Sequence, residues 1–364
     1  MATILPCAPA PTPCDGTIEH VTITQTPVIA PPDSTVYAAA RARSDAQAKP
    51  VGSLGRLEEL AAWIAACQGE CPPRALDDAR VVVFAGDHGV AASGVSAYPV
   101  EVTPMMTHGI LNGHAGVCAL ARSVGVSVSI YDLGVTAIEG VPDEVRRFHI
   151  GPARPLDTED ALTPEQRDAA LAAGDTLAAE AIAAGAQILA TGDLGIGNTT
   201  PSAALVAATL GLRGADVSGH GSGIDDAGLR RKITVIDRAL DRIGDRADDP
   251  HQRLAALGSA DIAAAVGFMA GAARRGVPIV VDGLIASAEA LLADALYPGT
   301  RAWLVAGHVS TEPGCALAQA HLGLEPIIDL RMRLGEGTGA VMGIGVLKAA
   351  VTALRDMPLL ADLM

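Results

Sequence analysis

A single glutamate stands between glycines in a stretch with few side chains to pack around it. Glu336 lies in residues 333–339, RLGEGTG, directly before an apolar segment. Glycines on both sides let the backbone carry this carboxylate into a cleft, where it could take a proton from a substrate. A glutamate in the first turn of a helix is also favoured by the helix dipole, so the sequence leaves a structural role equally open.

Four further groups of polar residues each follow a short apolar or β-branched run. They are residues 86–89 (GDHG), 191–200 (TGDLGIGNTT), 282–283 (DG) and 307–312 (GHVSTE). Each group alone is ordinary turn chemistry. Ligands of open α/β proteins bind at the carboxyl ends of parallel strands, so four such loops at equivalent ends predict one shared cleft.

The glycine-rich residues 192–200 are the best candidate for holding a phosphate. Their glycines permit close backbone approach, Thr199 or Thr200 can cap the following helix, and Pro201 suits its first turn. The N-terminus of that helix would direct N–H groups at an anion. The spacing matches neither the dinucleotide fingerprint nor the P-loop, and a well-capped structural turn is the alternative.

Several charged side chains are weaker candidates. Lys232 could add a cation beside the phosphate, although a solvated lysine on a helix is commoner. Asp87, His88 and His308 could be bases or ligands, although histidines more often bond within their own loop. The sequence has no H-E-x-x-H motif, paired-carboxylate metal spacing or C-x-x-C pair. We therefore expect neither a metal nor another cofactor.

Alternating elements must position these residues. Strands are predicted at residues 80–85, 127–132, 186–190, 277–281 and 302–306. Helices are predicted near 57–64 and at 104–123, 164–184, 201–210, 226–243, 259–274, 285–296 and 338–354. Apolar strands joined by helical crossovers indicate an α/β fold with an open, mostly parallel sheet and helices on both faces. Residues 1–34, rich in proline and threonine, are interpreted as a flexible arm, and residues 35–355 as one unit.

Charge and composition disfavour several classes of protein. The net charge is −15 and aromatic residues make up 2% of the chain, which argues against neutralising a phosphate polymer or stacking its bases, and so against a nucleic-acid partner. The N-terminus has no basic start or continuous apolar core, and the longest uncharged stretch, 194–212, contains several polar residues. Neither a signal peptide nor a membrane span is predicted, and six cysteines without a paired motif fit the cytoplasm.

Six segments together resemble the nicotinate-nucleotide–dimethylbenzimidazole phosphoribosyltransferase family of cobalamin lower-ligand assembly. They are residues 49–58, 85–90, 192–201, 281–283, 307–314 and 333–339, in the family's order. The resemblance covers roughly residues 49–350, and six motifs in register are highly specific. It implies a Rossmann-like sheet at 76–324, a small helical subdomain from 35–75 and 325–364, and a homodimer.

The resemblance also implies roles for individual residues. Glu336 matches the family's general base, and Lys232 matches its phosphate-side lysine. The residues implied beside the ribose phosphate and nicotinate are Asp193, Gly195, Gly197, Asn198, Thr199, Gly283 and Ser310. The residues implied around the benzimidazole are Tyr98, Met106, Leu194 and Leu334.

The implied reaction needs only one carboxylate. In nicotinate mononucleotide the glycosidic nitrogen is already a pyridinium, so nicotinate can leave without a general acid. The azole acceptor attacks the ribose through one nitrogen while Glu336 accepts the proton of the other. Attack from the opposite face inverts the anomeric centre and gives α-ribazole 5′-phosphate, with no metal required.

Three positions depart from the family pattern, and other functions stay open. Asp193 stands where many members have glutamate, Met106 where a glutamine often lines the base pocket, and Val309 where an arginine is common. These changes leave the accepted base undetermined. A nicotinate-mononucleotide hydrolase and a non-catalytic carrier of a base or ribotide are the alternatives, whereas a nicotinamide-dependent dehydrogenase lacks its fingerprint.

Overall fold

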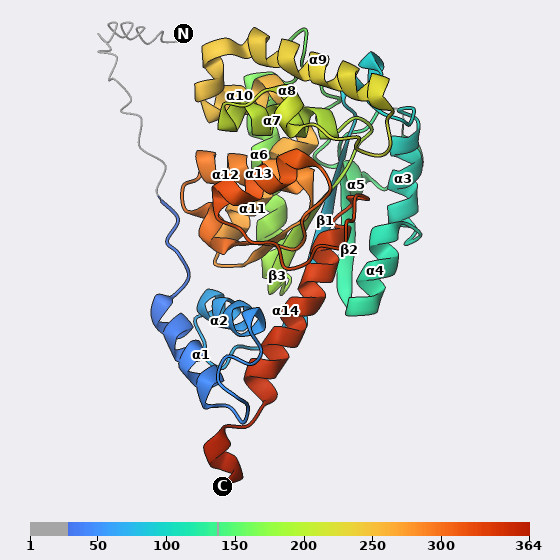
Figure 1. The fold of residues 1–364 in the computed structure, drawn as a ribbon. Coiled ribbons are helices and arrows are strands. Elements are labelled where there is room, and N and C mark those ends of the chain that lie inside the picture. The colour runs from blue at the N-terminus through green and yellow to red at the C-terminus, as the bar shows by residue number, and fades with distance from the viewer. Residues whose placement is uncertain (1–27, 137) are drawn as a thin grey trace, which may run out of the picture.

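The computed structural model describes residues 28–136 and 138–364, so most of the predicted N-terminal arm, residues 1–27, lies outside the described residues. Within the described part, five parallel strands form one sheet in the order β2-β1-β3-β4-β5 (Figure 1). The strands are β1 Ala79–Gly86, β2 Val126–Gly134, β3 Ile188–Leu194, β4 Ile279–Val281 and β5 Leu304–Ala306. All five predicted strands are present, and the predicted open parallel sheet is confirmed.

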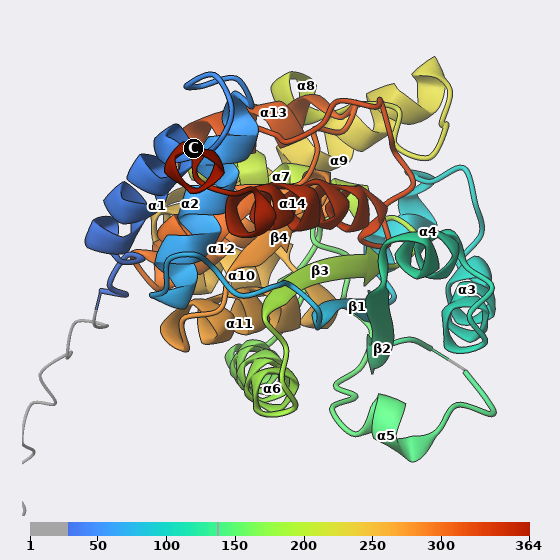
Figure 2. The same cartoon turned by 90° about the horizontal axis from the view of Figure 1, so that it is seen from below.

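Helices cover both faces of this sheet, as the edge-on view shows (Figure 2). The longer helices are α1 Ser34–Ala46, α2 Arg56–Gln68, α3 Val102–Leu111, α4 Gly116–Val124, α6 Pro164–Ala183, α7 Thr199–Leu210, α9 Asp226–Ile243, α10 Pro250–Leu257, α11 Ala260–Arg274, α12 Leu284–Leu296, α13 Pro313–Leu322 and α14 Thr338–Asp356. Two single turns, α5 Asp143–Arg146 and α8 Gly214–Val217, complete the α-helical set.

The two faces of the sheet build separate cores, because successive side chains of a strand point to opposite faces. On β1, Val82 and Phe84 pack into the core that includes α6, α7, α11 and α12. Val81 and Val83 pack into the core that includes α2, α4 and α14. The chain needs few aromatic residues because its helices approach closely: a Cβ on Gly174 of α6 would lie 1.8 Å from the carbonyl oxygen of Ala264 on α11.

Several elements begin or end differently from the sequence-based expectation. The helix predicted at 104–123 is two helices, α3 and α4, and Gly113 between them has a φ of +73°. β3 continues to Leu194 in register with β1, so Thr191 to Leu194 belong to a strand and not to a loop. The C-terminal end of β3 is therefore set by its pairing with β1 and not by the local glycine content.

The start of α7 also differs from the prediction. The helix begins at Thr199, and no side chain caps it. The Thr199 hydroxyl instead accepts a hydrogen bond from Lys232, so the proposed threonine cap is wrong. Two of the longer helices, α10 and α13, were not predicted. Asp249 before Pro250 is a usual helix-start signal, and it caps α10.

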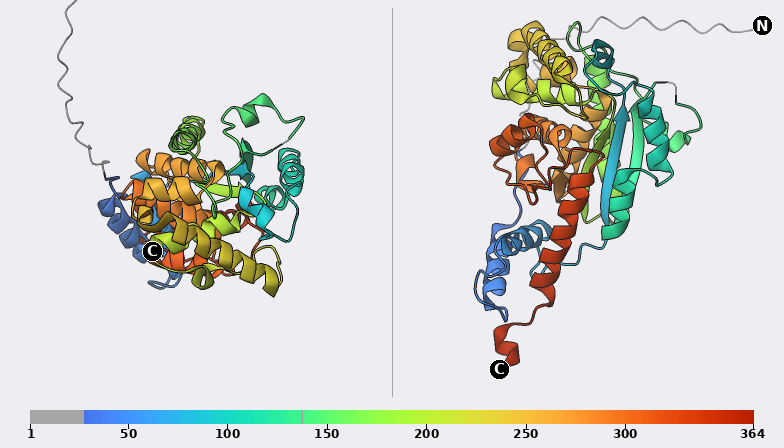
Figure 3. Two further views of the ribbon diagram at one scale, coloured as in Figure 1. Left: turned by 90° about the horizontal axis from the view of Figure 1, so that it is seen from above. Right: turned by 45° about the vertical axis from the view of Figure 1, so that its right-hand side comes forward.

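The two ends of the described chain pack against each other (Figures 1 and 3). α1 and α2 contact α14, and the side chain of Gln47 donates hydrogen bonds to the carbonyl oxygens of Ala353, Leu354 and Met357. Residues 35–75 and 325–364 are therefore neighbours in space. Because α2, α14 and β1 share one core, a separate helical subdomain stays a prediction.

Two further segments are fixed by contacts with the core. The backbone of Ile29 donates to Pro298, and the Trp303 indole donates to Ala30, so the last part of the predicted arm lies against the α12–β5 connection. α14 is long and apolar enough to cross a membrane by length and composition alone, but 56% of its most apolar window is buried inside the fold. We assign α14 to the core.

Candidate active site

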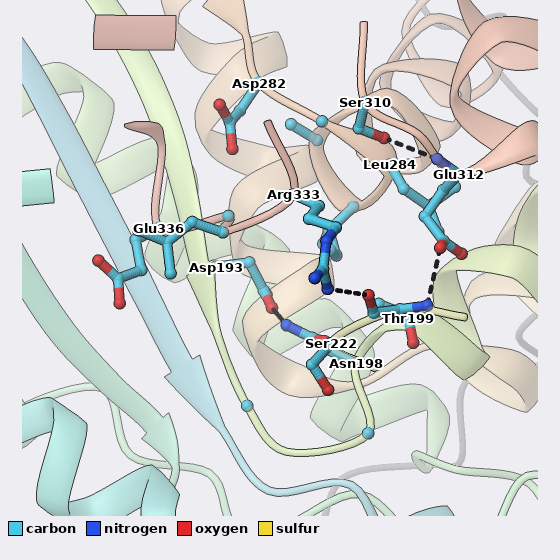
Figure 4. Close-up of a pocket in the computed structure, with 18 of the residues that line it drawn as sticks. Asp193, Asn198, Thr199, Ser222, Asp282, Leu284, Ser310, Glu312, Arg333 and Glu336 are labelled. Atoms are coloured by element: carbon cyan, nitrogen blue, oxygen red, sulfur yellow. Dashed lines mark hydrogen bonds between the residues drawn. The ribbon is translucent and has the colours of Figure 1, made fainter. Parts of the chain in front are cut away.

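A cleft with an empty volume of about 930 Å³ opens at the carboxyl ends of the central strands (Figure 4). Residues at or directly after the ends of β3, β4 and β5 line it, and open α/β sheets bind their ligands at the carboxyl ends of their strands. The predicted residues that line it are Tyr98, Asp193, Gly195, Gly197, Asn198, Thr199, Gly283, His308, Ser310, Leu334 and Glu336. The shared cleft expected from the polar loops is present, although Asp87 and His88 of the first loop do not line it.

The backbone of Glu336 is held in an unusual conformation. Its φ is +60°, and those of Gly335 and Gly337 are +81° and +86°. A positive φ is strained for a residue with a side chain. The segment also lies directly on β3, since a Cβ on Gly192 would come within 2.4 Å of the Glu336 carbonyl oxygen. Glycines on two elements therefore determine where this glutamate lies.

Glu336 is 5% exposed and lines the cleft. Its Oε2 accepts a hydrogen bond of 3.1 Å from the backbone N–H of Val117, at the start of α4. Burial raises the pKa of Glu336, the Val117 amide opposes this shift, and the charge of Asp282 adds to it. A raised pKa makes the ionised carboxylate a stronger proton acceptor.

Lys232 is fully buried, which excludes the solvated-lysine alternative. Its Nζ donates to Thr199 Oγ1 at 3.1 Å and lies 3.6 Å from Glu312 Oε2. The Glu312 carboxylate also accepts from the backbone N–H groups of Gly219 and Gly221, at 3.0 and 2.8 Å. Burial lowers the pKa of Lys232, and Glu312 opposes the shift. Lys232 lies behind the cleft wall and ties α9 to the glycine-rich loop.

Sequence reasoning missed Arg333 as a site residue. Its guanidinium points into the cavity in Figure 4 and donates to the carbonyl oxygen of Gly221 at 3.3 Å. Among the described residues that line the cleft, it is the only arginine or lysine. Its position three residues before Glu336 is the feature of the sequence that could have identified it. The segment that faces it, His220 to Ser222, carried no signal beyond its glycines.

Each of the two candidate histidines lies beside a carboxylate from another segment and not beside one of its own loop. His308 Nε2 lies 3.4 Å from Asp282 Oδ1, and that oxygen accepts from the backbone N–H of Ala340 at the start of α14. Burial alone would raise the pKa of Asp282, but His308 and the amides lower it, so Asp282 is ionised. His88 Nε2 lies 3.3 Å from Asp261 Oδ2.

One side of the cleft is apolar. Tyr98 is 53% exposed and Leu334 59% exposed, and both line it. Exposed apolar side chains around a cavity are typical of a binding surface. Met106 and Leu194 do not line the cleft and instead contribute to the core that contains α2 and α14. Asp87 lies away from the cleft and accepts from the backbone N–H of Thr136.

A Rossmann-like sheet whose cleft combines a glycine-rich loop with a buried carboxylate fits an enzyme that handles a phosphorylated sugar. Residues 29–362 match the family model described as Phosphoribosyltransferase, so the protein is an enzyme of this class. The chain belongs to the nicotinate-nucleotide–dimethylbenzimidazole phosphoribosyltransferase family.

Individual relatives match this chain over most of their own length. The proteins of that name from Mycobacterium marinum and Mycobacterium tuberculosis are each 50% identical to this chain, over 92% and 90% of it and 93% and 91% of their own lengths. The crystal structure of CobT from Thermus thermophilus superimposes with a TM-score of 0.85 at 42% identity, covering 90% of this chain and 98% of its own.

Proposed function

We propose that this enzyme transfers the 5-phosphoribosyl group of nicotinate mononucleotide to dimethylbenzimidazole or a related base. The products are nicotinate and α-ribazole 5′-phosphate. The observation that carries the proposal is that the buried Glu336 lies in one cleft with Arg333 and the glycine-rich loop. Relatives that share half of the sequence bear the name of this activity.

The mononucleotide is assigned to the polar side of the cleft. Its phosphate would meet the glycine-rich loop at Gly195 to Thr199, where α7 begins and where Lys232 holds the Thr199 hydroxyl. Arg333 supplies the guanidinium that an anion requires, since it is the only arginine or lysine among the described residues that line the cleft. Gly283 and Ser310 would border the ribose and nicotinate.

The accepting base is assigned to the apolar side, between Tyr98 and Leu334. One ring nitrogen of the base bonds to the anomeric carbon as the bond to the nicotinate nitrogen breaks. Glu336 accepts the proton from the other ring nitrogen, and its charge also favours positive charge that develops on the ribose. Because the base attacks opposite the leaving group, the anomeric centre is inverted. Met106 and Leu194 would not contact the base and would only support the apolar side of the cleft from behind.

Two properties of the enzyme belong to the same proposal. We assign it to the cytoplasm, consistent with the free thiols of Cys67, Cys71, Cys118 and Cys315. We assign a homodimer by its resemblance to the family.

The deciding experiment is a chromatographic assay of the purified protein with nicotinate mononucleotide, with and without dimethylbenzimidazole. Nicotinate and an α-ribotide that appear only with the base would establish the transferase. Nicotinate release at the same rate without the base would identify a hydrolase, and binding of both substrates without turnover would identify a carrier.

A further inference from the structure

A buried cluster of three titratable side chains lies behind the glycine-rich loop. His88 follows β1, Asp193 belongs to β3 and Asp261 to α11; all are buried, and one nitrogen or oxygen of each lies within 4.8 Å of those of the other two. Glycines make this approach possible. A Cβ on Gly195 would lie 2.5 Å from His88 Nε2, and one on Gly86 would lie 2.8 Å from Asp261 Cγ.

The cluster lacks the hydrogen bonds that buried charges require. Asp193 Oδ2, both oxygens of Asp261 and both ring nitrogens of His88 have no hydrogen-bond partner among the described residues. No arginine or lysine of the described chain forms an ion pair with either aspartate. Two ionised aspartates against one histidine would leave a negative charge inside the protein, which is strongly unfavourable.

We infer that Asp193 and Asp261 share one proton, so that His88, Asp261, Asp193 and Asn198 form a continuous hydrogen-bonded chain that positions the glycine-rich loop. In this chain His88 Nε2–H and Asp193 Oδ2–H both donate to Asp261. Asn198 Nδ2 donates to Asp193 Oδ1, a bond already present. One proton thereby gives partners to four of the five orphaned atoms, and His88 Nδ1 alone is left.

The electrostatic surroundings place the proton on Asp193. Burial raises the pKa of Asp193, and the charges of Asp261 and Glu289 raise it further. Burial alone would also raise the pKa of Asp261, but His88 lowers it. Two further groups face the cluster. The buried hydroxyl of Ser259, before α11, also lowers the pKa of Asp261. Glu289 of α12 accepts from the Thr191 hydroxyl at 2.8 Å, and its pKa is also raised by burial.

A neutral Asp193 has a consequence for binding. It lines the cleft next to the loop assigned to the phosphate, and a carboxylate there would repel a mononucleotide that carries several negative charges. His88 and Asp261 act through Asp193 and are positioning residues. The identity of the bound anion rests on the proposed function, whereas the shared proton does not.

Infrared difference spectroscopy at neutral pH tests the proton directly. The wild-type protein should show the carbonyl band of a protonated carboxylic acid, and this band should be missing in Asp193→Asn. Glu289→Gln serves as the matched control, because its own carboxyl band would disappear while that of Asp193 persists. If the carboxylic acid band persisted in Asp193→Asn, the inference would be overturned. A stoichiometric metal ion found in the purified wild-type protein by elemental analysis would also overturn it.

Kinetics test the positioning role. We expect Asp261→Asn, which lets Asp193 ionise, to raise KM for nicotinate mononucleotide about 3- to 10-fold while KM for the base stays unchanged. His88→Asn should act in the same direction, and His321→Asn at an exposed position of α13 should change neither constant. Equal changes in both KM values would overturn the positioning role. A wild-type protein that does not bind the mononucleotide would contradict the proposed function and leave the infrared result standing.

Discussion

The Glu336 side chain is buried, its backbone has a positive φ, and its carboxylate accepts a hydrogen bond from one backbone amide. We expect Glu336→Gln to lower kcat by about 100- to 10,000-fold, the usual contribution of a general base. Glutamine keeps the size of the side chain and an oxygen for the Val117 amide, so calorimetric affinity for the mononucleotide should be unchanged. Glu59→Gln, at an exposed position of α2, is the control. Near-normal turnover of Glu336→Gln would remove Glu336 from the chemistry.

The raised pKa of Glu336 also predicts a pH dependence. The carboxylate can accept a proton only when ionised, so kcat should fall as the pH decreases through a pKa above the ordinary 4.5. The measurement is kcat against pH with both substrates saturating. The residual activity of Glu336→Gln should lack this acidic limb, and an unchanged limb in that variant would assign the titration to another group.

Lys232 and Glu312 form a buried ion pair whose partners depend on each other. Lys232→Met leaves the Glu312 charge unpaired, so we expect the free energy of unfolding to fall by about 3–5 kcal/mol in urea titrations. Lys232→Met/Glu312→Gln should recover much of that loss, because no buried charge remains. We expect both variants to bind the mononucleotide more weakly than wild type, because the Thr199 hydroxyl loses its bond to Lys232. A single variant as stable as wild type would show that the pair contributes nothing.

At the scale of elements, the contact between β3 and residues 335–337 places the carboxylate. A Cβ on Gly192 would lie 2.4 Å from the Glu336 carbonyl oxygen and 3.0 Å from the Gly337 nitrogen, and backbone atoms cannot move aside as a flexible side chain can. We therefore expect Gly192→Ala to displace the segment and lower kcat by at least about 10-fold, which corresponds to about 1.4 kcal/mol.

The matched control for this prediction is Gly109→Ala in α3. The nearest heavy atom to a Cβ there is Met106 Cε at 3.9 Å, so the change should leave kcat unaltered and raise helix stability slightly. If Gly192→Ala retained full turnover with an unchanged melting temperature, close packing on β3 would not control the position of Glu336.

At the scale of the whole molecule, Gln47 joins the two ends of the described chain. It is 1% exposed and donates to three carbonyl oxygens near the end of α14. Gln47→Ala leaves these acceptors without partners, so we expect a loss of about 1–3 kcal/mol in the free energy of unfolding. Gln252→Ala, at an exposed position of α10, should stay within about 0.5 kcal/mol, and equal effects of both changes would contradict the prediction.

Local sequence was sufficient for the strands and most of the helices. The runs around Val81 and Val280 are apolar because parallel strands are buried on both faces, and α9 begins and ends where its amphipathic pattern does, Asp226–Ile243. The sequence failed where pairing or packing overrides local preference. The β3 extension to Leu194 depends on β1, and the break between α3 and α4 depends on a glycine with positive φ.

For the site, residue type and spacing along the chain were enough to identify the motifs that carry polar side chains and to place Glu336 between two glycines. Which distant groups meet depends on how the helices pack on the sheet. The tertiary structure buried Lys232 against Glu312, brought Arg333 into the cleft and set Asp261 beside Asp193. Contacts between residues far apart in sequence, and the burial that shifts their pKa values, arise only when the helices pack on the sheet.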